Sequence, residues 1–396
     1  MDLGTLLYVL RPLVLILALV GCGNPPSPSV VVDDEPFLSL VETLGGADTV
    51  GYARAMETRD FDFPGDHGPH EDFRTEWWYV TGNLDAEDGR ELGFQFTIFR
   101  SSLAPTPPGG PSIWSTNQAY MGHFAVTDIT NEDFRAVELF SRGGGGLAGA
   151  RAEPFEVWLE DWRLEGLSND VAFPMRLTAD GDGVNLDLIL ESGKPYVLQG
   201  DAGLSQKGRE PGNASYYYAH TRMPTRGRVQ IDEDHLEVSG LAWLDREWST
   251  SALSDGQVGW DWFALQLSDG WDLMVYQLRR EDGSPDPLSD GVLISPEGRR
   301  VPLEWGRGVL VEPTQTWLSP VDDAEYPSGW RIRVPEQELD LTVTPALPDQ
   351  ELRVAFRYWE GSVRVSGKGP GGNEVSGRGY VELTGYAGPS LQDGAK

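Results

Sequence analysis

The segment Glu76-Trp-Trp-Tyr-Val-Thr-Gly-Asn-Leu84 is rich in aromatic and β-branched residues and stops at Gly-Asn. This composition predicts a β-strand that ends in a turn. The preceding Asp66-His-Gly-Pro-His70 cannot form a helix, because Gly and Pro interrupt it and the residue before Pro favours extended backbone. A loop that holds two of the chain's five histidines therefore leads directly into a Trp-rich strand. Polar groups at such a junction are typical of binding or catalytic sites.

The next residues predict the second strand of a hairpin. Asp85-Ala-Glu-Asp-Gly89 predicts a turn, and residues 92, 94, 96 and 98 are apolar at every second position, whereas Gln95 lies between them. Alternation of this kind indicates a half-buried strand. Residues 120–128 predict a further strand, with His123 on its less apolar face. Two more strands are expected at 155–164 and 184–190, joined by the turn at 180–183.

The composition of the whole chain favours an all-β protein. Its 396 residues include 48 Gly, 28 Pro and 14 Trp, and no convincing long amphipathic helix occurs between residues 77 and 385. Only residues 38–44 have apolar residues at helical spacing, which predicts one short helix before the core. Short strands separated by turn signals indicate a sandwich or a barrel.

An internal similarity predicts two related β-domains. Residues 77–84, with Asp-Gly at 88–89 and the strand 92–96, are echoed by residues 260–267, Asp-Gly at 269–270 and the strand 273–277. We interpret this as one β-unit used twice, joined in the Ser/Gly/Asp-rich segment 249–259. The alternative is chance similarity between two hairpins, because the hairpin pattern is common.

The N-terminus predicts export and a lipid anchor. An apolar run over residues 6–20 has the length of a signal-peptide core, and Leu19-Val-Gly-Cys22 resembles a bacterial lipobox. We therefore expect a lipoprotein signal peptide at 1–22, lipidation of Cys22, a tether and short N-terminal segment at 23–59, and an extracytoplasmic, membrane-anchored location. The alternative is an ordinary secretory signal that leaves Cys22 free. The net charge of -31 excludes nucleic acid as a partner, because a phosphate backbone would be repelled.

Two polar clusters are candidates for chemistry. His67 and His70 have the spacing of two metal ligands, but the chain has a single Cys and Pro69 keeps the pair off a helix face, so we expect imidazole hydrogen bonds and no metal or other cofactor. The second cluster, residues 242–249, places Asp245, Arg246 and Glu247 between two tryptophans. For Arg246 with Glu247 we expect an ion pair that closes the sheet.

Together these motifs resemble the AttH/CrtC family of lipocalin-like proteins, which includes the carotenoid 1,2-hydratases. The resemblance rests on the loop and strand at 66–84 and on residues 94–100, 121–128, 214–218 and 242–249. It implies two tandem lipocalin-like (calycin-type) antiparallel β-barrels, at 60–248 and 249–388, with a ligand site at or between their mouths. In the hydratases an Asp protonates an alkene, and Trp243-Leu-Asp245 matches that segment, with Tyr218-Ala-His220 as its upstream partner.

The resemblance implies two sets of site residues. The catalytic set is Asp245, His220, Tyr218 and Trp243. The set that binds the ligand or supports the site is His67, His70, Glu76, Trp78, Gln95, His123, Arg246 and Glu247. The sequence departs from the hydratases at Arg246, because an adjacent Arg favours an ionised Asp245 and so weakens it as an acid.

Two functions remain open from the sequence. One is water addition to a hydrophobic isoprenoid or polyene, as in a hydro-lyase of the carotenoid 1,2-hydratase kind, where aromatic faces stabilise a carbocation. The other is a non-enzymatic lipid-binding lipoprotein that serves an ABC transporter permease. A purely structural lipoprotein leaves the clustered His, Asp and Arg residues unexplained.

Overall fold

The expected hairpin opens the first sheet. The structure is a computed structural model that describes residues 49–169, 171–251 and 253–387. Strand β1 (Thr75–Ala86) pairs antiparallel with β2 (Glu91–Ser102) around a turn at Gly89, where φ is +92° and a side chain would be strained. Leu92, Phe94 and Phe96 all enter the core on one face of β2, as their alternation predicts.

The first sheet is built from the described residues between 75 and 249. Its order is β4-β3-β2-β1-β13-β12-β9-β8-β7-β6-β5, so the first strand pairs with the last, and β10 and β11 also pair with β12. The remaining strands are β3 (Gln118–Asp128), β4 (Asp133–Arg142), β5 (Ala148–Arg151), β6 (Glu156–Leu159), β7 (Trp162–Gly166), β8 (Met175–Gly181), β9 (Val184–Leu190), β10 (Val197–Leu198), β11 (Leu204–Gln206), β12 (Ala214–Ile231) and β13 (Asp234–Ser249). Two 3-10 turns, η1 (Gly65–His67) and η2 (Gly144–Gly146), accompany them.

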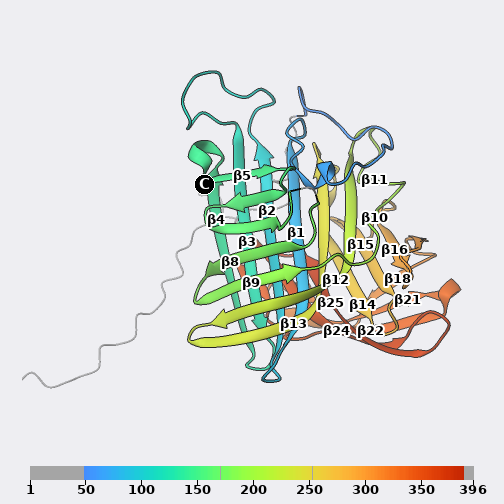
Figure 1. Cartoon of the computed structure of the whole chain (residues 1–396). Coiled ribbons are helices and arrows are strands. Elements are labelled where there is room, and N and C mark those ends of the chain that lie inside the picture. Colours follow the sequence, from blue (N-terminus) through green and yellow to red (C-terminus); the bar gives the residue numbers. More distant parts are fainter. Residues whose placement is uncertain (1–48, 170, 252, 388–396) are drawn as a thin grey trace, which may run out of the picture. The chain divides into compact units, whose positions relative to one another are not determined.

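This sheet curls into a nearly closed barrel. Strands β8 and β9 run across β1, β2 and β3 in the view of Figure 1, and β5 and β6 contact β3. The barrel interior is tightly filled: a Cβ added at Gly122 of β3 would lie 2.7 Å from Leu159 Cδ2 and 2.9 Å from Trp162. A larger residue at position 122 would therefore push these strands apart.

The second sheet repeats this plan with fewer strands. Its order is β17-β16-β15-β14-β25-β24-β22-β21-β18, with β23 on β24, so its first strand again pairs with its last. The strands are β14 (Gln257–Leu267), β15 (Asp272–Arg280), β16 (Asp290–Ile294), β17 (Arg300–Glu304), β18 (Leu310–Pro313), β21 (Trp330–Val334), β22 (Leu339–Pro345), β23 (Glu351–Arg353), β24 (Arg357–Lys368) and β25 (Glu374–Leu383). A small hairpin of β19 (Thr316–Leu318) and β20 (Glu325–Pro327) and the 3-10 turn η3 (Pro335–Gln337) lie outside it.

The two sheets pack against each other inside one compact unit. Buried aromatic and aliphatic side chains of both sheets form a shared cluster. Polar contacts also cross the interface. Buried Asp272 of β15 forms ion pairs with Lys194 and Arg222, each at 2.7 Å. The division into independent domains at 60–248 and 249–388 stays a prediction, although the sheets change between Ser249 and Gln257.

Some expectations differ in detail or lie outside the described residues. The strand expected at 155–164 is two strands, β6 and β7, because Glu160 turns the chain with φ of +53°. The turn at 180–183 joins β8 to β9. The signal peptide, Cys22 and the helix expected at 38–44 lie outside the described residues. No helix in the described part of the chain has the length and apolar character needed to cross a bilayer.

Candidate functional site

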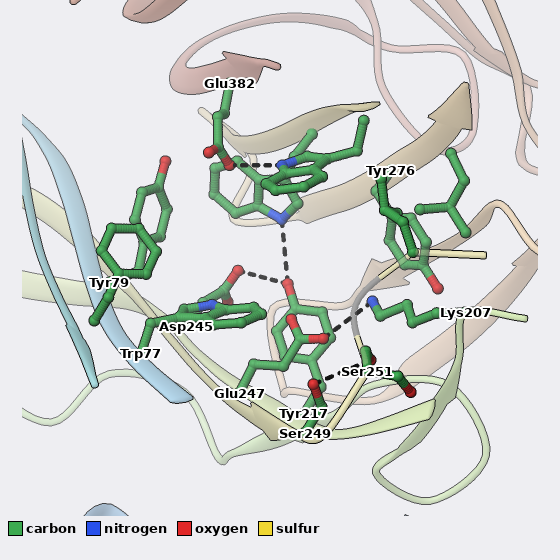
Figure 2. A pocket seen from close by; sticks show the side chains of 15 residues that line it. Trp77, Tyr79, Lys207, Tyr217, Asp245, Glu247, Ser249, Ser251, Tyr276 and Glu382 are labelled. Atoms are coloured by element: carbon green, nitrogen blue, oxygen red, sulfur yellow. Dashed lines mark hydrogen bonds and ion pairs between the residues drawn. The ribbon is translucent and has the colours of Figure 1, made fainter. Parts of the chain in front are cut away.

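An aromatic cavity of about 80 Å³ lies between the two sheets (Figure 2). Strands β1, β2, β12 and β13 of the first sheet and β14, β15 and β25 of the second supply its walls. Acidic groups and one lysine project among the rings. The lining residues are Trp77, Tyr79, Phe99, Lys207, Tyr217, Asp245, Glu247, Ser249, Ser251, Leu253, Trp260, Trp262, Tyr276, Leu278 and Glu382.

Asp245 of β13 is buried in the cavity wall and is held by two donors. The Tyr217 hydroxyl donates to its Oδ2 at 2.5 Å, and Trp243 Nε1 donates to its Oδ1 at 2.8 Å. Burial raises the pKa of Asp245 from 3.8 to about 7, although both hydrogen bonds act in the opposite direction. The carboxyl is therefore able to give or take a proton near neutral pH.

Arg246 forms no ion pair with Asp245 or Glu247, its neighbours in the chain. The ion pair expected between Arg246 and Glu247 is therefore wrong, and so is the expectation that Arg246 favours an ionised Asp245. Successive residues of a strand point to opposite faces, which sends Arg246 away from the cavity. Its guanidinium forms a fully buried ion pair with Glu76 and lies 3.8 Å from the ring centroid of Trp78.

Lys207 is the cationic partner of Glu247 instead. Its Nζ lies 3.1 Å from Glu247 Oε1 and 4.3 Å from the ring centroid of Tyr276. The Ser215 hydroxyl also donates to Glu247. Burial acts to lower the pKa of Lys207, but the Glu247 carboxylate outweighs it and the pKa rises. The lysine therefore stays charged in the cavity wall.

Glu382 of β25 enters the cavity from the other sheet (Figure 2). Its Oε2 accepts a hydrogen bond of 3.0 Å from Trp260 Nε1. Burial, with a further contribution from Glu247, raises the pKa of Glu382 to about 7. Asp245, which is buried, and Glu382, which is half-buried, are thus two carboxyls, one from each sheet, that titrate in the same range.

Tyr218 and His220 do not line the cavity, because they point from β12 to the face opposite Tyr217. Tyr218 shares a hydrogen bond of 2.6 Å with His67 Nδ1. His220 accepts the Gly193 N–H at 2.9 Å, and burial lowers its pKa to about 4. The hydrogen-bond partner of Asp245 on this strand is therefore Tyr217, one residue before the expected Tyr218.

Buried His67 and Glu76 and partly exposed His70 form a cluster on the opposite face of the first sheet from the cavity. The His70 ring stacks on Trp248 at 3.7 Å, and Trp78 Nε1 donates to the His67 carbonyl at 2.8 Å. Arg100 and Arg246 both pair with Glu76 and hold its pKa far below the usual range despite burial. These contacts fasten the loop to the sheet. Within the described ranges, no group of three or more His, Cys, Asp or Glu side chains is arranged to hold a metal ion.

The other two expected site residues lie between the sheets, outside the cavity lining. Gln95 donates to Thr97 Oγ1 at 2.6 Å. His123 shares hydrogen bonds with the Tyr358 hydroxyl at 2.8 Å and with Glu138 at 3.0 Å. Both side chains are fully buried. Of the residues expected for the site, only Asp245 and Glu247 line the cavity.

Comparison with known proteins identifies the family. The family model described as AttH-like matches residues 54–386. The chain belongs to the AttH-like family. This AttH-like protein is also 33% identical to a protein described as AttH from Nitrosomonas europaea, whose crystal structure it matches with a TM-score of 0.74 over 85% of this chain and all of that one.

Two fungal proteins resemble this AttH-like protein more distantly. The dehydratase asqC of Emericella nidulans is 22% identical over 236 residues, which are 56% of this chain and 64% of that enzyme, so the match spans less than two thirds of its length. The kievitone hydratase of Nectria haematococca is 15% identical, with a TM-score of 0.64 over 84% of this chain and 97% of that one. This second likeness shows the fold alone.

Sequence reasoning missed several cavity residues. The internal repeat aligns Trp77 with Trp260 and Tyr79 with Trp262, so it held a signal for the wall supplied by the second sheet. An acidic residue between Val381 and Leu383, at the apolar end of its strand, was the signal for Glu382. Lys207 lies in a polar loop that carries no signal, and only the tertiary structure brings it to Glu247.

Proposed function

We propose that this protein is a hydro-lyase that adds water to, or removes it from, a carbon–carbon double bond of an apolar substrate held between the sheets. One observation carries the proposal: Asp245 and Glu382 face the same aromatic cavity from different sheets, each with a pKa of about 7. Such a pair provides an acid and a base at neutral pH. The names of the two fungal relatives, a dehydratase and a hydratase, support the same reaction class.

The hydrogen bonds assign the two roles. Trp262 Nε1 donates to the Tyr217 oxygen at 3.1 Å, which directs the Tyr217 hydroxyl proton to Asp245. With the Trp243 N–H, Asp245 then has two donors, which favour its ionised form. Glu382 has one such donor, from Trp260. The charge of Glu247 raises the pKa of both carboxyls, whereas the charge of Lys207 lowers that of Asp245. We therefore assign Glu382 as the acid and Asp245 as the base for hydration, the reverse of the role that the resemblance implied for Asp245.

The reaction balances with these two groups. Glu382 gives its proton to one alkene carbon, and the other carbon becomes a carbocation. The surrounding aromatic faces, Trp77, Trp260 and Tyr276 among them, stabilise that cation. Water adds to the cation and loses a proton to Asp245. One water is consumed and one alcohol is formed, and dehydration follows the same steps in reverse.

The substrate class follows from the cavity walls. The rings of both sheets favour an unsaturated hydrocarbon, and a cavity of about 80 Å³ holds only its reacting end, so we propose an isoprenoid or polyene, as in carotenoid 1,2-hydration. We also propose that Cys22 anchors the protein to a membrane on its extracytoplasmic side, where such substrates dissolve. No cofactor is needed for the steps given above.

An alternative function uses the same cavity for binding only. A lipid carrier that serves an ABC transporter permease needs the aromatic walls but has no need of carboxyls that titrate near neutrality. The two pKa values of about 7 therefore favour the enzyme.

Isotope labelling tests the proposal. The full chain is incubated with kievitone or with neurosporene in H₂¹⁸O, and products are analysed by mass spectrometry. We expect a product heavier by one labelled water, and a loss of turnover of roughly 10²-fold or more in Asp245→Asn and Glu382→Gln. Asp261→Asn is the matched control, since burial raises the pKa of Asp261 to about 6 and Asp261 does not line the cavity. Binding of both compounds without any labelled product would favour the carrier instead.

A further inference from the structure

A chain of buried polar side chains begins at the cavity and leads away from it. Tyr79, in the cavity wall, donates its hydroxyl proton to Glu360 Oε1 of β24. Oε2 of Glu360 is buried and has no hydrogen-bond partner among the described residues. The hydroxyl of Tyr358, two residues earlier on the same face of β24, also interacts with this carboxyl. An ionised Glu360 would be costly here, because one oxygen has no donor.

From Tyr358 the series of polar side chains continues into the first sheet and reaches the surface. The Tyr358 hydroxyl lies 2.8 Å from His123 Nδ1 of β3, and His123 Nε2 lies 3.0 Å from Glu138 Oε1 of β4. The side chain of His123 is fully buried, whereas that of Glu138 is 10% exposed. Glu138 is also held by the Ala355 N–H at 3.1 Å. Hydrogen bonds therefore continue from the Tyr358 hydroxyl, which interacts with the Glu360 carboxyl, to the partly exposed Glu138.

The charges around Glu360 keep a proton on its carboxyl. Glu360 lies directly opposite Glu382 in the pairing of β24 with β25, so the two side chains share one face at close range. Burial, and then the charge of Glu382, raise the pKa of Glu360 well above its usual range. Tyr79, Tyr358 and Tyr380 are the other titratable groups that interact with Glu360, and burial raises the pKa of each of them as well.

We propose that a proton relay joins the cavity to the surface through five side chains, Tyr79, Glu360, Tyr358, His123 and Glu138. Its use in turnover rests on the proposed function. When an apolar substrate fills the cavity and displaces its water, the cavity carboxyls lose direct exchange with solvent, and the relay restores the proton that the acid has given.

Proton transfer along the relay conserves charge. A proton taken up at Glu138 passes to His123 Nε2, and the proton on Nδ1 passes to Tyr358. Tyr358 then passes its own proton to Glu360, Glu360 passes one proton to the Tyr79 oxygen, and Tyr79 releases its own hydroxyl proton to the deprotonated Glu382, which lines the same cavity. Each group gains one proton and releases one, so a single proton crosses and no co-reactant is needed.

The first test needs no substrate. The full chain is transferred into D₂O, and infrared spectroscopy follows the C=O band of protonated Glu360, identified by its loss in Glu360→Gln. Tyr358→Phe removes one hydroxyl from the relay and keeps the ring, so exchange at Glu360 should slow by roughly tenfold or more. Tyr326→Phe is the control, because Tyr326 is a buried tyrosine that donates to another carboxylate, Glu351, at 2.9 Å.

Each outcome decides the proposal. Slower exchange in Tyr358→Phe, and also in Glu138→Gln at the accessible end, supports the relay even if kievitone and neurosporene are not converted. Equal exchange in wild type and Tyr358→Phe overturns it, as does the absence of any protonated band that Glu360→Gln removes. If either compound is converted, Tyr358→Phe should lower kcat by about 10²-fold and leave KM unchanged. An unchanged kcat would remove the relay from turnover.

Discussion

The substitution Asp245→Asn is expected to change the pH dependence of stability. Asn has the size and hydrogen-bonding pattern of a protonated carboxyl: its oxygen accepts from Trp243 Nε1, and its amide donates to the Tyr217 oxygen in place of the present bond. The variant should therefore resemble wild type under acidic conditions, where Asp245 is protonated in the folded and in the unfolded chain.

The magnitude follows from the buried position of Asp245. Its pKa rises from 3.8 to about 7, and each unit corresponds to about 1.4 kcal/mol, so the full effect is about 4 kcal/mol. Between these two values the folded chain retains a proton that the unfolded chain has released. The free energy of unfolding of the wild type therefore falls as pH rises through this window: the contribution is fully present below about pH 4 and lost above about pH 7.

Urea unfolding, followed by tryptophan fluorescence, measures the effect. From about pH 5 to about pH 8, the stability of Asp245→Asn should rise by about 2–3 kcal/mol relative to wild type. Asp187→Asn is the control of opposite sign, because a hydrogen bond from Arg176 lowers the pKa of the half-exposed Asp187, and its contribution is lost as pH falls. A difference between Asp245→Asn and wild type that does not change with pH would refute the raised pKa.

Three further variants test other parts of the molecule. Cys22→Ser should move the protein out of the membrane fraction, since it removes the expected acylation site; retention after a salt wash would contradict the anchor. Lys207→Met leaves Glu247 buried without its cation and should cost about 3–5 kcal/mol in urea unfolding, of which the double variant with Glu247→Gln should recover a large part. Glu76→Gln should weaken folding by a similar amount, because Arg246 keeps no ionised partner, yet neurosporene binding measured by absorbance should not change.

Much of the fold was predictable because alternation in a strand is a local property. The apolar residues of β2 point into the first barrel, as their period of two indicates. The internal repeat also proved informative: the two hairpins that it aligns, β1–β2 and β14–β15, occupy the same place in the two sheet orders. The sequence predicted one strand where the structure has two, β6 and β7. The turn between them has no Gly or Pro and depends on Glu160 adopting a positive φ.

The site was less predictable because sequence adjacency misleads inside a strand. Asp245 and Arg246 are neighbours in the chain, but the pleat sends one into the cavity and the other to Glu76. The same alternation of side chains along β12 places Tyr217, and not Tyr218, beside Asp245. Contacts between distant segments, such as that of Lys207 with Glu247, depend on the packing of loops against sheets, which no local pattern encodes.

The repeat explains why two carboxyls of similar acidity meet in one cavity. In the alignment of the two hairpins, Tyr79 corresponds to Trp262, and the register pairs Tyr79 with Asp245 and Trp262 with Glu382. The two acids therefore occupy equivalent positions on the last strand of each sheet, and packing the sheets together turns both toward the shared interface. What distinguishes them is the side chain on the neighbouring strand, which is Ala219 opposite Asp245 but a third carboxyl opposite Glu382. Burial and the charge of Glu382 keep that third carboxyl protonated, so the Glu382 side of the cavity holds a second proton beside the assigned acid.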